Sequence, residues 1–319
     1  MKDKIKRFVN RQLTRRDLLI LKNKTFEDLV KEKNFYDEML KIETESQYIP
    51  EETLEILIFS FDRALQIYSL VKSIREYVNK PVKIHVIYRS TTSEHQKSYE
   101  ELISEFKDID FVSQKDKTDF KEKLISTLKK IKTQSMFFLV DDIVFKDYVK
   151  VEDLLEHDSK RYIFSLRMGD HLKRNQPMNK EQSLPEFIES TDEKLTWIWE
   201  GKDYDWGYPL SVDGNVFSTR EMILLAENTD YSAPNTFEGH IQKHLRFYSK
   251  RFGICYKSSR IVNLPINNVS TVTNNIHGNI DQESLLEKWN EGMMLDYKRF
   301  HKVNNISAHQ ELEVSFIKR

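Results

Sequence analysis

The sequence predicts an α/β protein with a mixed central sheet flanked by helices. From residue 54 onward, short apolar runs of strand length alternate with longer amphipathic segments of helical period. This alternation is typical of a sheet with helices packed on its faces. The apolar run 136–140 ends in two adjacent carboxylates, Asp141 and Asp142. Because ligands of open α/β sheets bind at the carboxyl ends of the strands, the acid pair indicates a ligand site at that edge.

Length and composition fit a globular protein of one large or two modest domains. The chain has 319 residues, of which 39% are hydrophobic, enough for a real core. Its 50 basic and 51 acidic residues nearly cancel, so no chain-wide field favours nucleic acid. The single cysteine, Cys255, excludes an internal disulfide and fits a reducing compartment. With no apolar run of spanning length and a charged start, we expect a cytoplasmic protein.

The amino-terminal stretch is strongly basic. Residues 1–24 contain nine lysines and arginines against two aspartates, interleaved with apolar side chains. Such a segment fits a basic amphipathic helix resting on the anionic inner face of a membrane, and fits equally a helix docked on its own domain. Helical spacing continues over residues 25–47, and Pro50 disfavours helix at the residue before it. Residues 1–50 are therefore expected to form a helical N-terminal extension.

Strand and helix signals then follow one another up to the acid pair. The expected strands are residues 54–59, 81–88, 110–113 and 136–140, and the expected helices end near residues 77, 106 and 131. An unpaired carboxylate in an apolar environment is costly, so Asp141 and Asp142 should lie at the end of the last strand. Clustered carboxylate oxygens there suit a hard divalent cation that also holds phosphate oxygens. The plainer alternative is a solvated strand end or a helix cap.

Two short motifs resemble those of the GT-A glycosyltransferases, whose fold is Rossmann-like. Residues 140–143, Val-Asp-Asp-Ile, resemble the family's DxD-type motif in the variant where an acid pair follows a hydrophobic strand. The resemblance implies that Asp142 binds Mn²⁺ or Mg²⁺ and that Asp141 contacts the sugar or ribose. Val140 stands where the family often has a first acid, and this departure bears on metal dependence.

The turn after the first strand resembles the family turn that lies against the nucleotide base and ribose. It reads Ser60-Phe61-Asp62-Arg63, and the resemblance implies Ser60, Phe61 and Arg63 as donor-binding residues. The alternative is that Asp62 caps the following helix and Arg63 is solvated. Many family members place a uracil-binding acid after the next strand, whereas this chain has Arg-Ser-Thr-Thr at residues 89–92. The nucleotide base is therefore open.

Three of the four tryptophans fall within ten positions of one another, namely Trp197, Trp199 and Trp206. Sugar rings present an apolar face that stacks on indole rings, so these residues are candidates for an acceptor or donor sugar platform. Ordinary packing of strands is the alternative. The preceding polar stretch, residues 171–192, is expected to be a loop.

The candidates for the catalytic base are Glu238 and Asp213. Glu238 begins an expected helix over residues 234–251, and GT-A enzymes often have the base at the start of such a helix. A helix-start acid stabilised by the helix dipole is the alternative for Glu238. Asp213 precedes a glycine within an expected strand over residues 210–219, where a ligand can approach the backbone closely.

The carboxyl-terminal part supplies one further candidate ligand. The resemblance implies His277 as an additional metal ligand, although a plain loop histidine is the alternative. Asp281 is expected to cap a last amphipathic helix that runs through Met293 and Tyr297 and ends before a polar tail.

Together these patterns predict a nucleotide-sugar glycosyltransferase. The expected domains are an extension over residues 1–50, a GT-A catalytic domain over 51–279 with a donor half (51–145) and an acceptor half (146–279), and a helix and tail over 280–319. The expected reaction is an inverting hexosyl or related transfer, metal-assisted, to a glycan or lipid-linked acceptor in surface polysaccharide synthesis. The alternatives are a nucleotidyltransferase and a non-catalytic module that binds glycan or membrane. No nucleic acid partner is expected.

Overall fold

The computed structural model describes residues 23–44, 49, 51–267 and 280–319. Contacts between residues divide the chain into two compact units, Met1–Ser46 and Gln47–Arg319. The first unit contains helix α2 (Asn23–Thr44), and residues 45–47 of the expected 25–47 helix lie outside the described residues. Most of the basic stretch, residues 1–22, lies outside the described residues.

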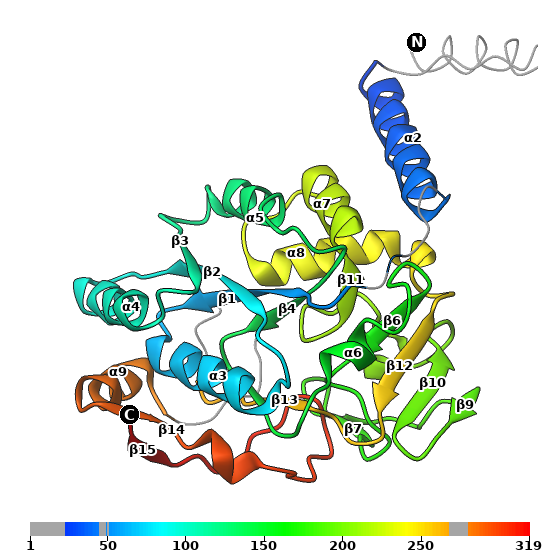
Figure 1. The fold of residues 1–319 in the computed structure, drawn as a ribbon. Coiled ribbons are helices and arrows are strands. Elements are labelled where there is room, and N and C mark those ends of the chain that lie inside the picture. Colours follow the sequence, from blue (N-terminus) through cyan, green and yellow to red (C-terminus); the bar gives the residue numbers. More distant parts are fainter. Residues whose placement is uncertain (1–22, 45–48, 50, 268–279) are drawn as a thin grey trace, which may run out of the picture. The chain divides into compact units, whose positions relative to one another are not determined.

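The second unit is built on a five-stranded mixed sheet, which confirms the predicted fold class (Figure 1). Its strand order is β11-β4-β1-β2-β3, and the strands are β1 (Glu55–Phe61), β2 (Lys83–Arg89), β3 (Asp110–Ser113), β4 (Ser135–Val140) and β11 (Val216–Ser218). Strands β1 to β4 run parallel, and only β11 is antiparallel to its neighbour β4. The register aligns Phe59 with Val140 and Phe61 with Arg89, so β1, β2 and β4 end at the same edge.

Helices cover both faces of this sheet (Figure 1). They are α3 (Ala64–Tyr77), α4 (Ser93–Glu105), α5 (Phe120–Leu128), α6 (Val151–Leu154), α7 (Thr219–Asn228), α8 (Pro234–Ile241) and α9 (Gln282–Asn290), with 3-10 turns η1 (Tyr204–Gly207), η2 (Gln242–Phe247) and η3 (Tyr297–Phe300). Figure 1 shows α3 and α9 on one side of the sheet, with α5 and α7 on the other.

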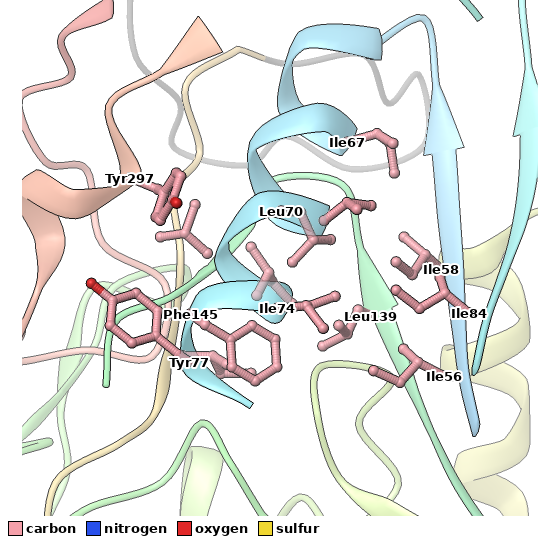
Figure 2. Close-up of a cluster of buried hydrophobic side chains, with 14 of the residues drawn as sticks. Ile56, Ile58, Ile67, Leu70, Ile74, Tyr77, Ile84, Leu139, Phe145 and Tyr297 are labelled. Carbon is pink, nitrogen blue, oxygen red and sulfur yellow. The ribbon is translucent and has the colours of Figure 1, made fainter. Parts of the chain in front are cut away.

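The core between α3 and the sheet draws on distant parts of the chain. Figure 2 shows α3 side chains such as Leu70 and Ile74 facing isoleucines and leucines of β1, β2 and β4. Phe145 and Tyr297 close the same cluster from residues after β4 and near the C-terminus. Because Tyr297 is only 3% exposed, the C-terminal segment belongs to the core of this unit.

A second, smaller sheet has the order β6-β12-β10-β9. Its strands are β6 (Tyr162–Ser165), β12 (Phe252–Tyr256), β10 (Lys194–Ile198) and β9 (Glu189–Ser190). Three two-stranded ladders complete the strands: β13 (Ile261–Asn263) with β5 (Ile143–Phe145), β14 (Met293–Leu295) with β15 (Phe316–Lys318), and β7 (Arg174–Asn175) with β8 (Lys180–Glu181).

Several expected elements are shorter than predicted. The last helix ends at Asn290, because Gly292 takes a left-handed φ of 73°. Met293 and Tyr297 therefore lie in β14 and η3, and the expected polar tail instead returns as β15 to pair with β14. The expected 210–219 strand is reduced to β11, since Gly214 also has a positive φ of 75°. The expected 171–192 loop contains the short strands β7, β8 and β9.

The packing of β12 against β10 predicts a position intolerant of any side chain. A Cβ on Gly253 would lie 2.4 Å from the Trp197 ring, and Trp197 is 0% exposed and cannot move aside. We expect Gly253→Ala to lower the free energy of unfolding by about 1–3 kcal/mol. Gly239 in α8 is the matched control, because a Cβ there meets nothing within 4 Å. Urea denaturation of both variants checks this, and equal stabilities would contradict it.

Candidate active site

An open cleft of about 960 Å³ lies over the carboxyl ends of β1, β2 and β4. The acid pair and the Ser60–Arg63 turn line its floor. Arg89, Gln114 and Lys117 line it on the side of β2 and β3, while Asp213 and Glu238 line it on the side of β11. The cleft thus has two halves lined by different side chains. One lies at the β2–β3 end of the sheet, and the other lies at the β11 end.

The β1–α3 turn is fixed by Asp62. This residue has a left-handed φ of 53°, and its carboxylate accepts hydrogen bonds from Thr91 N (2.8 Å) and Thr91 Oγ1 (2.6 Å). Asp62 is therefore not the cap of α3, whose N-cap residue is Arg63. On the same side of the cleft, the Arg89 guanidinium lies 4.1 Å from the centre of the Phe61 ring. The turn thus presents an aromatic ring with a cation stacked on it.

Both carboxylate oxygens of Asp141 accept hydrogen bonds from the β1–α3 turn. It is 4% exposed, and its Oδ2 accepts from Ser60 Oγ (2.9 Å) and Phe61 N (3.0 Å), while Oδ1 accepts from Arg63 Nη1 (2.7 Å). Arg63 itself is 7% exposed. Burial alone would lower the pKa of Arg63, but the carboxylates of Asp141 and Asp142 raise it, so the guanidinium stays charged. The alternative of a solvated Arg63 is wrong.

Asp142 accepts fewer hydrogen bonds than Asp141 and is more exposed. Its Oδ2 accepts from the same Arg63 Nη1 (3.1 Å) and its Oδ1 from Asn263 Nδ2 (2.9 Å), and 15% of the side chain is exposed. Burial and the neighbouring carboxylates of Asp141 and Asp213 raise the pKa of Asp142 to about 6, against the opposing effect of Arg63. Each carboxylate oxygen offers two lone-pair directions, so Asp142 keeps acceptor capacity toward the cleft.

The described residues contain no group of three or more His, Cys, Asp or Glu side chains that could hold a metal ion. A catalytic Mg²⁺ or Mn²⁺ nevertheless needs only one or two carboxylates when substrate phosphates supply other ligands. The free acceptor capacity of Asp142 fits such a partial site, and its side chain is more exposed than that of Asp141 (15% against 5%). His277, the other predicted ligand, lies outside the described residues.

The half of the cleft at the β11 end of the sheet holds Glu238, Asp213 and a histidine that sequence reasoning missed. His309 Nε2 lies 2.9 Å from Asp213 Oδ2. The tail reaches this place because it pairs with β13: Asn263 N donates to Ala308 O, and Gln310 N donates to Asn263 O, each at 3.0 Å. No local motif marks His309 in the sequence, since a pairing between distant segments places it.

The environment separates the pKa values of the two acids. Burial and the nearby Asp213 charge raise the pKa of Glu238 to about 7. Burial would also raise the pKa of Asp213, but the hydrogen bond and charge of His309 lower it below its usual value. Glu238 Oε1 accepts from Val212 N at 3.1 Å, which fixes the carboxyl group beside the Asp213 segment. Two neighbouring acids thus differ in their readiness to take a proton.

The prediction of a tryptophan platform is wrong. Trp197, Trp199 and Trp206 are each at most 1% exposed, and the Trp197 ring packs on the other two with centroid distances of 4.6 and 5.0 Å. The described residues that line the cleft include none of the three. The rings instead form a buried cluster around Trp197 of β10, whereas Tyr204 and Tyr208 line the cleft.

The ion pair between His309 and Asp213 predicts a pH-dependent contribution to stability. The pKa of His309 is raised by Asp213 against the effect of burial, and that of Asp213 is lowered by His309. An acid whose pKa is lowered by folding stabilises the folded state above its unfolded pKa. A histidine whose pKa is raised by folding stabilises the folded state at low pH, and this stabilisation is lost as the pH rises through the folded pKa. The pair therefore stabilises most between about pH 4 and 6.5.

We expect His309→Gln to destabilise the protein more at pH ~5.5 than at pH ~9, because the stabilisation from a histidine with a raised pKa is lost as the pH rises. Urea denaturation at both values measures this, with the exposed His240→Gln as control. A destabilisation by His309→Gln that is the same at both pH values would contradict the ion pair.

No helix in the described part of the chain is long and apolar enough to cross a membrane. No family model matches the chain. Among solved structures it is similar to the mannosyltransferase PcManGT from Pyrobaculum calidifontis in complex with GDP-Man and Mn²⁺, at 10% identity over 72% of this chain and 67% of that chain, with a TM-score of 0.37. It is also similar to a nucleotidyl transferase from Methanothermobacter thermautotroptrophicus, at 10% identity over 66% and 89% of the chains, with a TM-score of 0.37. Likenesses this distant do not distinguish the two activities.

The chain also has a relative that is similar in sequence. The chain is 22% identical over 268 residues to the bifunctional glycosyltransferase pgtA of Dictyostelium discoideum. The match covers 70% of this chain and 33% of that protein, so the chain spans about a third of the relative's length. This similarity confirms the resemblance to glycosyltransferases that the motifs around Arg63 and Asp142 indicate.

Proposed function

We propose that the protein transfers a sugar from a nucleotide-diphosphate donor to an acceptor hydroxyl, with inversion at the transferred carbon. One observation carries the proposal: the Arg63–Asp141–Asp142 network and the Glu238–Asp213–His309 group line one cleft, close enough for the charge of Asp213 to act on Asp142. The first group suits a charged diphosphate, and the second contains a carboxylate suited to take a proton. An inverting transfer needs these two functions on opposite faces of the reacting sugar.

The donor would lie along the carboxyl ends of β1, β2 and β4. Phe61 with its stacked Arg89 offers a surface for the nucleotide base, and the Asp62 carboxylate holds this turn in place. Asp142 would hold a Mn²⁺ or Mg²⁺ ion together with the diphosphate oxygens. When bound, this ion supplies charge neutralisation for the departing diphosphate.

Glu238 would act as the general base. As the acceptor oxygen forms its bond to the sugar, the bond from the sugar to the diphosphate breaks, and the acceptor proton passes to the Glu238 carboxylate. A base with a pKa near the working pH is best suited to this transfer, and that of Glu238 is raised to about 7. Asp213 is the poorer base, because His309 keeps it ionised.

The nucleotidyltransferase alternative lacks its usual phosphate loop. Such enzymes normally have a glycine-rich basic loop after the first strand, whereas here the turn is Ser60–Arg63, without glycine. A non-catalytic module would need no carboxylate with a raised pKa beside the cleft. We therefore favour sugar transfer over both alternatives. We further propose that the acceptor is a glycan or a lipid-linked molecule, as in surface polysaccharide synthesis, and that the sugar is a hexose or a related residue.

A panel of nucleotide-sugars with Mn²⁺ or Mg²⁺, scored for nucleotide release, tests the activity directly.

We expect Asp142→Asn to lose at least about tenfold in metal-dependent nucleoside diphosphate affinity, because it removes the charge but keeps a side chain of the same size. Asp141 is not a suitable probe, since it also holds the β1–α3 turn. Calorimetric titration measures the affinity, with the exposed Asp108→Asn as control. Undiminished metal-dependent binding by Asp142→Asn would remove Asp142 from the metal site.

Glu238→Gln should keep donor affinity and lose about 10²-fold or more in turnover, because an amide cannot take the acceptor proton. Asp213→Asn should change substrate binding more than turnover. Steady-state kinetics with an acceptor found in the panel separates the two. If Glu238→Gln turns over at the wild-type rate, the base is another residue and Asp213 takes its place in the proposal.

A further inference from the structure

Arg167 is a buried cation in the Glu238 half of the cleft that the proposed reaction does not use. It follows β6 and lines the cleft, although its side chain is only 3% exposed. Leu166 N, one residue earlier, donates to Gly214 O at 3.0 Å, which sets Arg167 beside the Asp213 segment. Its charge lowers the pKa of both Glu238 and Asp213. Arg167 therefore lies close to the carboxylates where the acceptor hydroxyl would react.

One edge of the Arg167 guanidinium has no partner among the described residues. Nη1 lies 3.1 Å from Asp205 Oδ1, but Nε and Nη2 are buried without any hydrogen bond. The Nε–H and one Nη2–H of a guanidinium point the same way and form the fork that receives two oxygens of a carboxylate or phosphate. Buried donors are almost always paired, so an unpaired fork beside a cleft calls for a ligand with two acceptor oxygens.

The guanidinium is also held in a fixed orientation. Asp205 Oδ2 accepts from Asn175 Nδ2 (3.0 Å) and from Gln182 Nε2 (3.2 Å), and Asp205 N donates to Gln182 Oε1 (3.2 Å). Asp205 is 5% exposed and carries the Arg167 contact on its other oxygen. A carboxylate fixed in this way orients Arg167 before a ligand arrives, which reduces the entropy lost on binding.

We propose that the Nε/Nη2 edge of Arg167 binds an anionic group, a carboxylate or a phosphate, carried by the acceptor. The proposal rests on the proposed function and deepens it: the acceptor would be an acidic glycan or a phosphate-containing polymer or lipid. A neutral acceptor would leave the fork unpaired, and a site built to hydrogen-bond a group discriminates strongly against analogues that lack it. Arg167 is thus a specificity residue for the acceptor.

The test compares matched probes on protein saturated with nucleoside diphosphate and Mn²⁺. Ligand-observed NMR would measure the affinity of methyl glucuronide against methyl glucoside and of glycerol 3-phosphate against glycerol. We expect the wild type to bind at least one anionic probe about tenfold or more tightly than its neutral partner. Arg167→Lys keeps the charge but not the fork, and should lose most of this preference with donor affinity unchanged. Arg260→Lys is the matched control, because Arg260 also pairs through Nη1 with one aspartate, Asp147 (2.6 Å).

The outcomes separate the two proposals. Equal affinities for charged and neutral probes in the wild type, or a preference that Arg167→Lys retains, would overturn the role of Arg167 while leaving the proposed function intact. A preference seen only between nucleotide-glucuronate and nucleotide-glucose donors would place the anion on the donor and overturn the acceptor assignment. Failure of the wild type to bind any nucleoside diphosphate would overturn the proposed function itself.

If Arg167→Lys does not fold, a competition experiment on the wild type replaces it. Inorganic phosphate should displace the anionic probe, and no displacement would overturn the role of Arg167.

Discussion

The buried ion pair between Arg63 and Asp141 is the interaction on which the active-site edge depends. It joins the β1–α3 turn to the end of β4 (2.7 Å), and Arg63 Nη2 also donates to Asn267 O at 2.6 Å. Three segments far apart in sequence therefore meet at one guanidinium. Removing one partner of such a pair would leave an uncompensated buried charge, which typically costs about 3–5 kcal/mol. The edge of the sheet is consequently held together by contacts within the chain itself.

This pair also explains why two adjacent aspartates differ in role. All three hydrogen bonds that Asp141 accepts come from the β1–α3 turn. Both of its carboxylate oxygens therefore hold this turn in place. Asp142 shares Arg63, accepts its other hydrogen bond from Asn263 after β13, and is the more exposed of the two side chains. The two acids of the motif thus differ in their contacts: Asp141 holds the β1–α3 turn, whereas Asp142 is the one that we propose as the metal ligand.

Local patterns were enough to predict the sheet and the strand-end acids, because burial and periodicity are properties of neighbouring residues. The strands β1, β2 and β4 and the position of Asp142 follow from apolar runs that end in polar residues. His309 could not be found in this way, since the pairing of the tail with β13 places it. Arg167 did carry a signal, a charged residue at the end of an apolar strand, of the same kind as the acid pair. The tryptophans misled because a cluster of aromatic residues predicts burial as well as it predicts a ligand platform.

The charges in the Glu238 half of the cleft are arranged in compensated pairs with one exception. His309 faces Asp213 at 2.9 Å and Arg167 faces Asp205 at 3.1 Å. Glu238 lies near these pairs, and its carboxylate accepts a hydrogen bond from a backbone amide, Val212 N. A carboxylate whose charge is not neutralised by a salt bridge gains most from protonation, so the proton of an acceptor hydroxyl would go to Glu238. Under the proposed function, the two ion pairs leave Glu238 as the acid best suited to be the base.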